Sequence, residues 1–228
     1  MCGRFTIVFD SDELMERFNV NEVPYEWNKR YNIAPGQLIP AIIEDRGQRR
    51  LGQLKWGLVP YWSKDEKSSY KMINAKAETI QEKPAFKQLF VRKRCIIPAD
   101  GFYEWRKVGV EKHPMRIMLK TGEPFAFAGL FDTWTNPIGE KLHTCTILTT
   151  KPNQIVENIH DRMPVILQKQ DEAIWLDRHS YDADRLQSLL VPYDSEKMRA
   201  YPVPAIVGSP KNDMPACIEE IGDPYLFS

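Results

Sequence analysis

Short runs rich in β-branched and aromatic residues, each ended by turn-forming residues, recur along the chain and restrict what it can fold into. Runs of this kind joined by short glycine-containing turns are typical of β-hairpins. Three hairpins are therefore predicted, pairing residues 41–43 with 51–56, 95–97 with 102–105, and 115–119 with 125–131. A further strand, rich in threonine and leucine, is predicted at residues 141–150.

Helical patterns are confined to short stretches between these runs. Ser11 precedes two acidic residues and apolar residues at positions 14 and 18, which predicts a short helix capped by Ser11. The other helices are predicted at residues 84–92, 152–158, 171–177 and 182–191. Hairpins with interspersed helices, and no repeat or linker, predict a single α+β domain over residues 1–228 built on antiparallel sheet. The proline-rich segment from Tyr201 is expected to run extended over the surface.

Composition excludes several classes of protein. Hydrophobic residues make up 43% of the 228 residues, which suits a globular core, and no apolar run is long enough to cross a bilayer. The start of the chain lacks a basic region followed by an apolar stretch, so we expect a cytoplasmic protein without a membrane partner. Four widely separated cysteines, with no Cys-x-x-Cys pair, argue against a zinc site and a disulfide framework.

The charge is balanced overall but unevenly distributed. Residues 1–120 contain 22 Lys and Arg against 15 Asp and Glu, a net charge of +7, and the remainder carries −7. Such asymmetry permits a basic groove for a nucleic acid on a neutral protein. Scattered, solvated surface charge is the alternative, and this feature alone does not separate the two.

Cys2 becomes the amino-terminal residue if Met1 is removed, and cysteine is small enough to allow that removal. Its exposed α-amine would then have a pKa of about 7.7–8.0, leaving a nucleophilic fraction near neutral pH. An amine and a thiol on one residue react in turn with an aldehyde: the amine forms an imine, and the sulfur closes a five-membered thiazolidine ring. The alternative is a small buried residue at the start of a strand.

Glu104 and His160 are the residues best suited to proton transfer. On a strand, Glu104 would lie among aromatic side chains, where the pKa of a carboxyl rises toward neutral pH. His160 follows the predicted helix 152–158, and its imidazole titrates in the same range, with Asp161 or Arg162 available to orient it. The alternatives are a glutamate that faces solvent or pairs with the neighbouring arginine, and a loop histidine without a catalytic task.

Two further segments contain groups that suit single-stranded nucleic acid. Asn74 and Lys76 would face one side of an extended segment, offering an amide to hold a nucleophile and a cation for phosphate. Trp62 lies in a proline-bounded loop followed by three lysines, and rings interleaved with cations favour stacked bases and paired phosphates. A core tryptophan beside a solvated loop is the usual alternative.

Six blocks of the sequence, taken together and in order, resemble the SOS-response-associated peptidase family of abasic-site sensor and processing proteins. The blocks are residues 1–5, 30–35, 56–60, 73–78, 98–105 and 159–164. The resemblance implies a compact α+β fold with a twisted, barrel-like antiparallel sheet, peripheral helices and no metal or organic cofactor. It also implies a monomer that acts on abasic sites in single-stranded DNA, associated with the nucleoid in a bacterium.

The resemblance assigns roles to individual residues. Cys2 would form a thiazolidine crosslink with the ring-opened aldehyde, and Asn74 would hold the backbone and amine of Cys2. Glu104 would shuttle protons, and His160 would help to protonate the sugar oxygen and assist both formation and slow reversal of the crosslink. The DNA-binding residues implied are Arg4, Pro35, Trp62, Lys76 and Arg162.

Two departures from the family pattern concern only DNA contacts. Lys76 stands where arginine is common, which keeps the charge but loses bidentate phosphate binding, and Ser63 stands where a second aromatic residue can occur. Weak lyase activity toward abasic DNA would accompany trapping, because the imine also permits β-elimination. Two other functions stay open: an amino-terminal-nucleophile cysteine peptidase or amidohydrolase that can process its own Met1, and a non-catalytic module that binds single strands.

Overall fold

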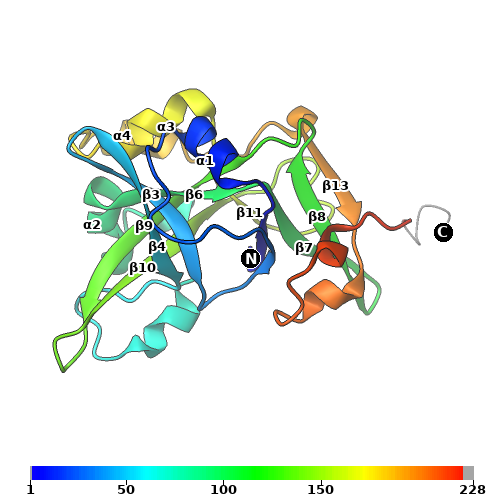
Figure 1. Ribbon diagram of the computed structural model, residues 1–228, viewed down its shortest axis with the longest axis horizontal. Helices are drawn as coiled ribbons and strands as arrows, with labels where there is room; N and C mark the ends of the chain where they lie inside the picture. The colour runs from blue at the N-terminus through cyan, green and yellow to red at the C-terminus, as the bar shows by residue number, and fades with distance from the viewer. Residues whose placement is uncertain (1, 223–228) are drawn as a thin grey trace.

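The computed structural model describes residues 2–222, which form thirteen strands and four α-helices (Figure 1). The strands are β1 (Phe5–Ile7), β2 (Arg30–Ile33), β3 (Leu38–Asp45), β4 (Gln48–Trp56), β5 (Asn74–Lys76), β6 (Arg94–Ala99), β7 (Gly101–Val108), β8 (Glu111–Leu119), β9 (Phe125–Thr135), β10 (Lys141–Thr150), β11 (Met163–Pro164), β12 (Ile166–Leu167) and β13 (Met198–Pro202). The helices are α1 (Ser11–Phe18), α2 (Pro84–Arg92), α3 (Glu172–Leu176) and α4 (Ala183–Ser188). Short 3₁₀ helices occupy Glu66–Lys71, Ala77–Thr79, Lys169–Asp171, Ser195–Lys197, Ala205–Gly208 and Pro215–Ile218.

Five strands close into a barrel. The strands follow the order β10–β4–β3–β6–β9, and an extensive antiparallel pairing of β9 with β10 closes the ring. Three short strands extend it: β5 and β11 pair with β10, and β12 pairs with β9. All pairings within the ring are antiparallel except β10 with β4, which is parallel. The α+β, barrel-like fold expected from the resemblance is therefore confirmed.

A second sheet packs against the barrel and contributes strand β7 to the site described below. Its order is β13–β8–β7–β1–β2, and the β7–β8 hairpin forms one side of the molecule (Figure 1). Phe5 of β1 joins the two sheets, because its ring lies edge-on to Trp56 at 5.2 Å and to Phe127 at 5.8 Å. The amino-terminal segment is thereby fixed to the barrel core.

Of the three hairpins predicted, one is confirmed and two are wrong. β3 and β4 pair over their full lengths around Arg46 and Gly47, both of which have positive φ, as a tight two-residue turn requires. β6 and β7 do not pair with each other, nor do β8 and β9, because each pair is divided between the two sheets. The hairpin partner of β8 is instead β7.

The chain changes sheets at Asp100, where a buried polar cluster forms a corner. The Asp100 carboxylate accepts hydrogen bonds from the Thr6 hydroxyl at 2.8 Å, the Val8 amide at 3.2 Å and the Arg116 guanidinium at 2.8 Å. Arg116 also donates to the Tyr201 hydroxyl at 2.8 Å. These long-range partners, rather than a local turn, decide the direction that β7 takes.

Gly101 makes this corner possible, and its replacement should destabilise the protein. A Cβ atom at position 101 would lie 2.7 Å from Nε of Arg116, whose guanidinium is held by its other partners. We expect Gly101→Ala to lower the free energy of unfolding by about 1–3 kcal/mol, measured by urea denaturation. Gly52→Ala is the matched control, because a Cβ atom at position 52 would meet nothing within 4 Å. Equal stabilities of the two variants would contradict this explanation.

The predicted helices are mostly confirmed, with two corrections. Helix α1 has the predicted bounds, but Asp10 rather than Ser11 caps it, by accepting a hydrogen bond from the Glu13 amide. The helix predicted at residues 152–158 is absent, and residues 154–159 form a series of turns instead. The segment after Tyr201 is not simply extended, because it contains two 3₁₀ helices. None of the helices between residues 2 and 222 is long and apolar enough to cross a membrane.

Candidate active site

Three residues that are distant in the sequence meet where the amino-terminal segment approaches β7. Cys2 lies three residues before the start of β1, Glu104 lies on β7, and His160 follows the turns at residues 154–159. Oε2 of Glu104 lies 3.9 Å from Nε2 of His160, and the Tyr103 amide donates a hydrogen bond of 3.0 Å to the Arg4 carbonyl, which runs the segment that contains Cys2 alongside β7. The structure therefore brings together a thiol, a carboxyl group and an imidazole.

Cys2 is buried, which corrects the expectation of an exposed thiol. Its side chain has no solvent exposure in the full chain and belongs to the same apolar core as Phe5. Burial, reinforced by the charge of Glu104, raises the pKa of the Cys2 thiol far above its ordinary value, although the Arg4 amide acts in the opposite direction. In this state the thiol is protonated and shielded.

Glu104 is placed to exchange protons near neutral pH. Only 3% of its side chain is exposed, so the alternative of a solvent-facing glutamate is wrong. Burial, with a smaller contribution from the charge of Asp161, raises the pKa of Glu104 from 4.5 to about 7. A carboxyl group with this pKa is present in both protonation states at neutral pH, as an acid–base catalyst requires.

Replacing Glu104 should reveal the cost of burying its charge. Because the folded-state pKa exceeds the ordinary value, the folded protein binds more protons than the unfolded chain between about pH 4.5 and 7, and its stability falls as pH rises through that window. We compare the free energy of unfolding of Glu104→Gln with that of the parent. We expect this difference to be about 2 kcal/mol larger, in favour of the variant, at pH 8 than at pH 5. Urea denaturation at both pH values measures this difference. The exposed Glu16→Gln control should show none, and an equal gain at the two pH values would contradict the assignment.

The orientation of the His160 ring is set by its own loop. Nδ1 lies 3.0 Å from the Arg162 amide nitrogen and also 3.0 Å from a carboxylate oxygen of the exposed Asp161. The ring nitrogen cannot accept from the first and donate to the second at once. Burial lowers the pKa of His160, which favours the neutral ring, and a backbone N–H can only donate. We therefore assign Nδ1 as the acceptor and place the proton on Nε2, facing Glu104.

Asn74 and the His160 loop lie on either side of one strand end. β5 pairs with β10 so that Lys76 is opposite Thr149, and β11, which follows the His160 loop, places Pro164 opposite the same threonine. The Asn74 amide donates a long hydrogen bond of 3.5 Å to the Ile147 carbonyl. Its Oδ1 atom is buried and has no hydrogen-bond partner within the described chain, so it can accept one from a group that enters the site.

Arg162 is held by an ion pair that the sequence reading missed. Its two terminal nitrogens each lie 2.8 Å from an oxygen of Glu78, and one also donates to the Thr149 carbonyl at 2.7 Å. This bidentate pair lowers the pKa of Glu78 and ties the Asn74 block to the His160 loop. The role of Arg162 in DNA binding stays a prediction. Glu78 lies within the motif at 73–78. The alternation of charged residues there could have marked Glu78 as a site residue, but not Arg162 as its partner.

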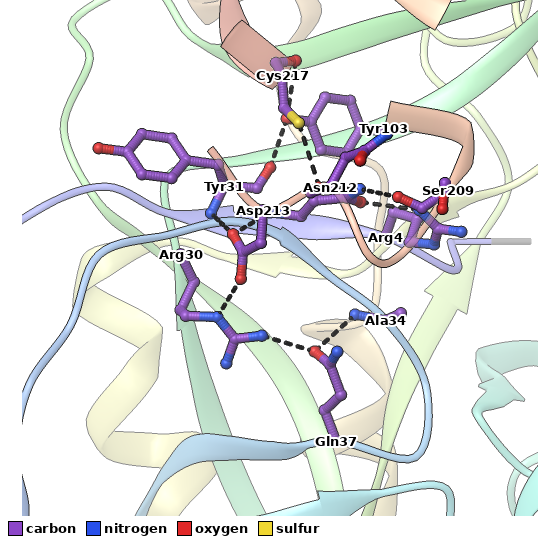
Figure 2. Close-up of polar contacts among 11 residues, drawn as sticks. Arg4, Arg30, Tyr31, Ala34, Gln37, Tyr103, Ser209, Asn212, Asp213 and Cys217 are labelled. Carbon is purple, nitrogen blue, oxygen red and sulfur yellow. Dashed lines mark hydrogen bonds and ion pairs between the residues drawn. The ribbon is translucent and has the colours of Figure 1, made fainter. Parts of the chain in front are cut away.

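Arg4 faces the carboxyl-terminal segment. Its guanidinium donates to the Val207 carbonyl at 2.7 Å, the Gly208 carbonyl at 3.0 Å and Oδ1 of Asn32 at 2.8 Å, and burial lowers its pKa. Figure 2 shows Arg4 beside this segment, which Asp213 also anchors by accepting hydrogen bonds from Arg30 and the Tyr31 amide. A phosphate would therefore compete with these carbonyls for Arg4, and its DNA-binding role remains untested.

The other predicted DNA-binding residues are accessible. Pro35 is half-buried in the connection between β2 and β3, and Lys76 is exposed at the end of β5. Trp62 has 55% of its surface exposed, so its side chain is not in the core. Among the described residues, no group of three histidine, cysteine, aspartate or glutamate side chains gathers as a metal site.

Comparison with known proteins identifies the family. The model of the SOS response associated peptidase (SRAP) family matches residues 1–210. The chain belongs to the SRAP family. It is 54% identical over 222 residues to the abasic site processing protein YoqW of Bacillus subtilis, covering 96% of this chain and 99% of that protein. With the abasic site processing protein HMCES of Xenopus tropicalis it shares 32% identity over 228 residues, or 86% of this chain and 67% of that protein.

The fold is also found in solved structures. A crystal structure of a protein from Bacteroides thetaiotaomicron superposes with a TM-score of 0.83 at 28% identity, covering 96% of this chain and all of that one. A second, from Bordetella bronchiseptica, gives a TM-score of 0.76 at 26% identity, covering 89% of this chain and all of that one. Together with the family match, these comparisons confirm the resemblance stated from the sequence.

Proposed function

We propose that this SRAP protein traps abasic sites in single-stranded DNA as a covalent conjugate with Cys2, and so shields them from strand cleavage. The observation that carries the proposal is the convergence of Cys2, Glu104 and His160 in one site. The names of the relatives, abasic site processing proteins, support the choice of substrate. Lys76 and Trp62 provide an exposed cation and an exposed aromatic ring for the strand.

The reaction begins at the amine that Cys2 acquires when Met1 is removed. The amine adds to the aldehyde carbon of the ring-opened sugar, and loss of water leaves an imine. The thiol then adds across the C=N bond: sulfur bonds to carbon, the thiol proton leaves, and the nitrogen regains a proton, which closes the thiazolidine ring. The reaction consumes no oxidant, reductant or cofactor.

The site residues have separate tasks in this scheme. Glu104 accepts the thiol proton and returns a proton to nitrogen, which its pKa of about 7 permits. The neutral His160 ring can donate a hydrogen bond from Nε2 to the sugar oxygen, and the buried Oδ1 atom of Asn74 can accept a hydrogen bond from the amine. Because the thiol is shielded in the full chain, the reaction requires Cys2 to become accessible, which we assign to the loss of Met1 and the entry of DNA.

A crosslinking assay tests the proposal directly. Protein whose Met1 is absent by intact mass is mixed with a single-stranded oligonucleotide that contains one abasic site. We expect a shifted band that survives denaturation without borohydride. A complex that forms only reversibly would instead favour the non-catalytic binding module. A weak strand-cleavage product is expected beside the conjugate, because the imine also permits β-elimination.

The peptidase alternative has its own test. Variants Glu104→Gln and Asn74→Ala are produced in cells lacking methionine aminopeptidase, and their intact masses are compared with that of the parent. Retention of Met1 only in the variants would support self-processing, whereas retention in all three would assign removal to the aminopeptidase. Cleavage of added peptides would favour a general peptidase.

A further inference from the structure

A cleft of about 510 Å³ lies between the loop after β4 and helix α2. One wall consists of Tyr61 and Trp62, whose side chains are 65% and 55% exposed. The opposite wall is the surface of α2 around Lys87, Gln88 and Arg92, all of which are exposed. The cleft does not include Cys2, Glu104 or His160.

Buried groups hold the two walls in place. Asp132 of β9 is 1% exposed, and its carboxylate accepts hydrogen bonds from the Tyr61 amide at 2.9 Å and from Nζ of Lys93, at the end of α2, at 2.7 Å. The indole of Trp134 donates to the Ser63 carbonyl at 2.8 Å. The aromatic loop is therefore fixed to the barrel and to the end of α2, and the separation of the two walls is set by the fold.

The charges of the cleft favour an anionic ligand. Lys87 and Arg92 have no carboxylate within 4 Å among the described residues, and Arg92 stacks over the Tyr181 ring at 5.7 Å instead. The buried Asp132 is neutralised by Lys93, which leaves Glu82 as the exposed carboxylate of the lining. An aromatic wall facing a cationic wall matches the base and the phosphate of one nucleotide.

We propose that this cleft binds a nucleotide of the single strand beyond those held at the active site. The base stacks on the aromatic wall of Tyr61 and Trp62, and a phosphate contacts Lys87 or Arg92. This inference rests on the proposed function for the choice of ligand. It adds helix α2, which contains none of the family motifs, to the DNA-binding surface.

Binding of undamaged oligothymidylates tests the proposal, because these strands cannot form the covalent conjugate. Fluorescence anisotropy is measured with short and long strands, of about 5 and about 20 nucleotides, at several salt concentrations. The salt slope is the slope of log affinity against log salt concentration. Each phosphate contact on a single strand contributes about 0.7 to it, which corresponds to about fivefold in affinity at 0.1 M salt relative to 1 M. We expect the double variant K87A/R92A to bind the long strand about fivefold more weakly, with a salt slope smaller by about 0.7. Its affinity for the short strand should change little.

The control variant K107A/K112A removes the same charge from the β7–β8 hairpin. Lys107 and Lys112 are exposed and directly opposite one another in the hairpin, which lies on the other side of the molecule from α2 (Figure 1). This variant should bind the long strand as the parent does. Equal losses in both double variants would show a general charge effect and overturn the proposal, as would parental binding by K87A/R92A.

The aromatic wall and the covalent reaction are tested separately. Trp62→Ala should weaken binding of the long strand about fivefold or more, because stacking of one base contributes at least that factor. K87A/R92A should still crosslink a short abasic oligonucleotide at the parental rate. A parent that binds strands but never crosslinks them would refute the proposed function alone, whereas parental binding by K87A/R92A would refute the cleft alone.

Discussion

Cys2→Ala should abolish the stable conjugate with abasic DNA while leaving noncovalent binding of single strands intact. The variant keeps an amino-terminal amine, so it can still form an imine, but it lacks the sulfur that closes the ring. Since an intramolecular nucleophile contributes an effective concentration far above that of any external one, we expect the borohydride-independent product to fall by more than about 100-fold. Denaturing electrophoresis with and without borohydride measures both species.

The buried position of Cys2 adds a second measurement to this prediction. All four cysteines are buried and unpaired as free thiols. Protein that retains Met1 should therefore react slowly with a thiol reagent, whereas processed protein should gain one reactive thiol that Cys2→Ala removes. Cys2→Ser is the conservative control for folding. An undiminished stable crosslink in Cys2→Ala would refute the assignment of the nucleophile.

Glu104→Gln should slow crosslink formation by about 100-fold and remove the rise of its rate around pH 7. Proton transfer by a placed side chain typically contributes a factor of about 10²–10⁴. In the parent, the rate should rise as pH increases through about 7, because Glu104 must be ionised to accept the thiol proton. The glutamine variant cannot ionise, so this rise should disappear, and only the rise set by the α-amine, with its pKa of about 7.7–8.0, should remain in its pH–rate profile.

Structural and catalytic effects of this substitution can be separated. The free energy of unfolding of the glutamine variant, relative to the parent, should be larger at pH 8 than at pH 5, so a variant that is slow but shows this difference cannot be explained by misfolding. Glu111→Gln on β8, a residue outside the site, is the matched control and should keep the parental profile. A Glu104→Gln variant with the parental rate and pH profile would exclude Glu104 as the proton carrier.

Much of the candidate site could be predicted from the sequence because its residues occur in short motifs. Glu104 on a strand among aromatic residues and His160 in a loop were found in this way, and the structure places them 3.9 Å apart. The Glu78–Arg162 pair was missed, because the partners are separated by 84 residues and no local signal connects them. The burial of Cys2 was only one of two alternatives from the sequence, because the core that covers it is assembled from many strands.

The sequence by itself determined the elements whose causes are local. Turn residues with positive φ fixed the β3–β4 hairpin, and proline at the first position together with the apolar spacing fixed α2. Tertiary structure decided which strands pair and where the chain changes sheets. β6 and β7 are adjacent in sequence but part at Asp100, because Thr6, Val8 and Arg116 supply the hydrogen bonds of its buried carboxylate. Those partners lie outside any local window of sequence, so only the assembled fold could select between a hairpin and a corner.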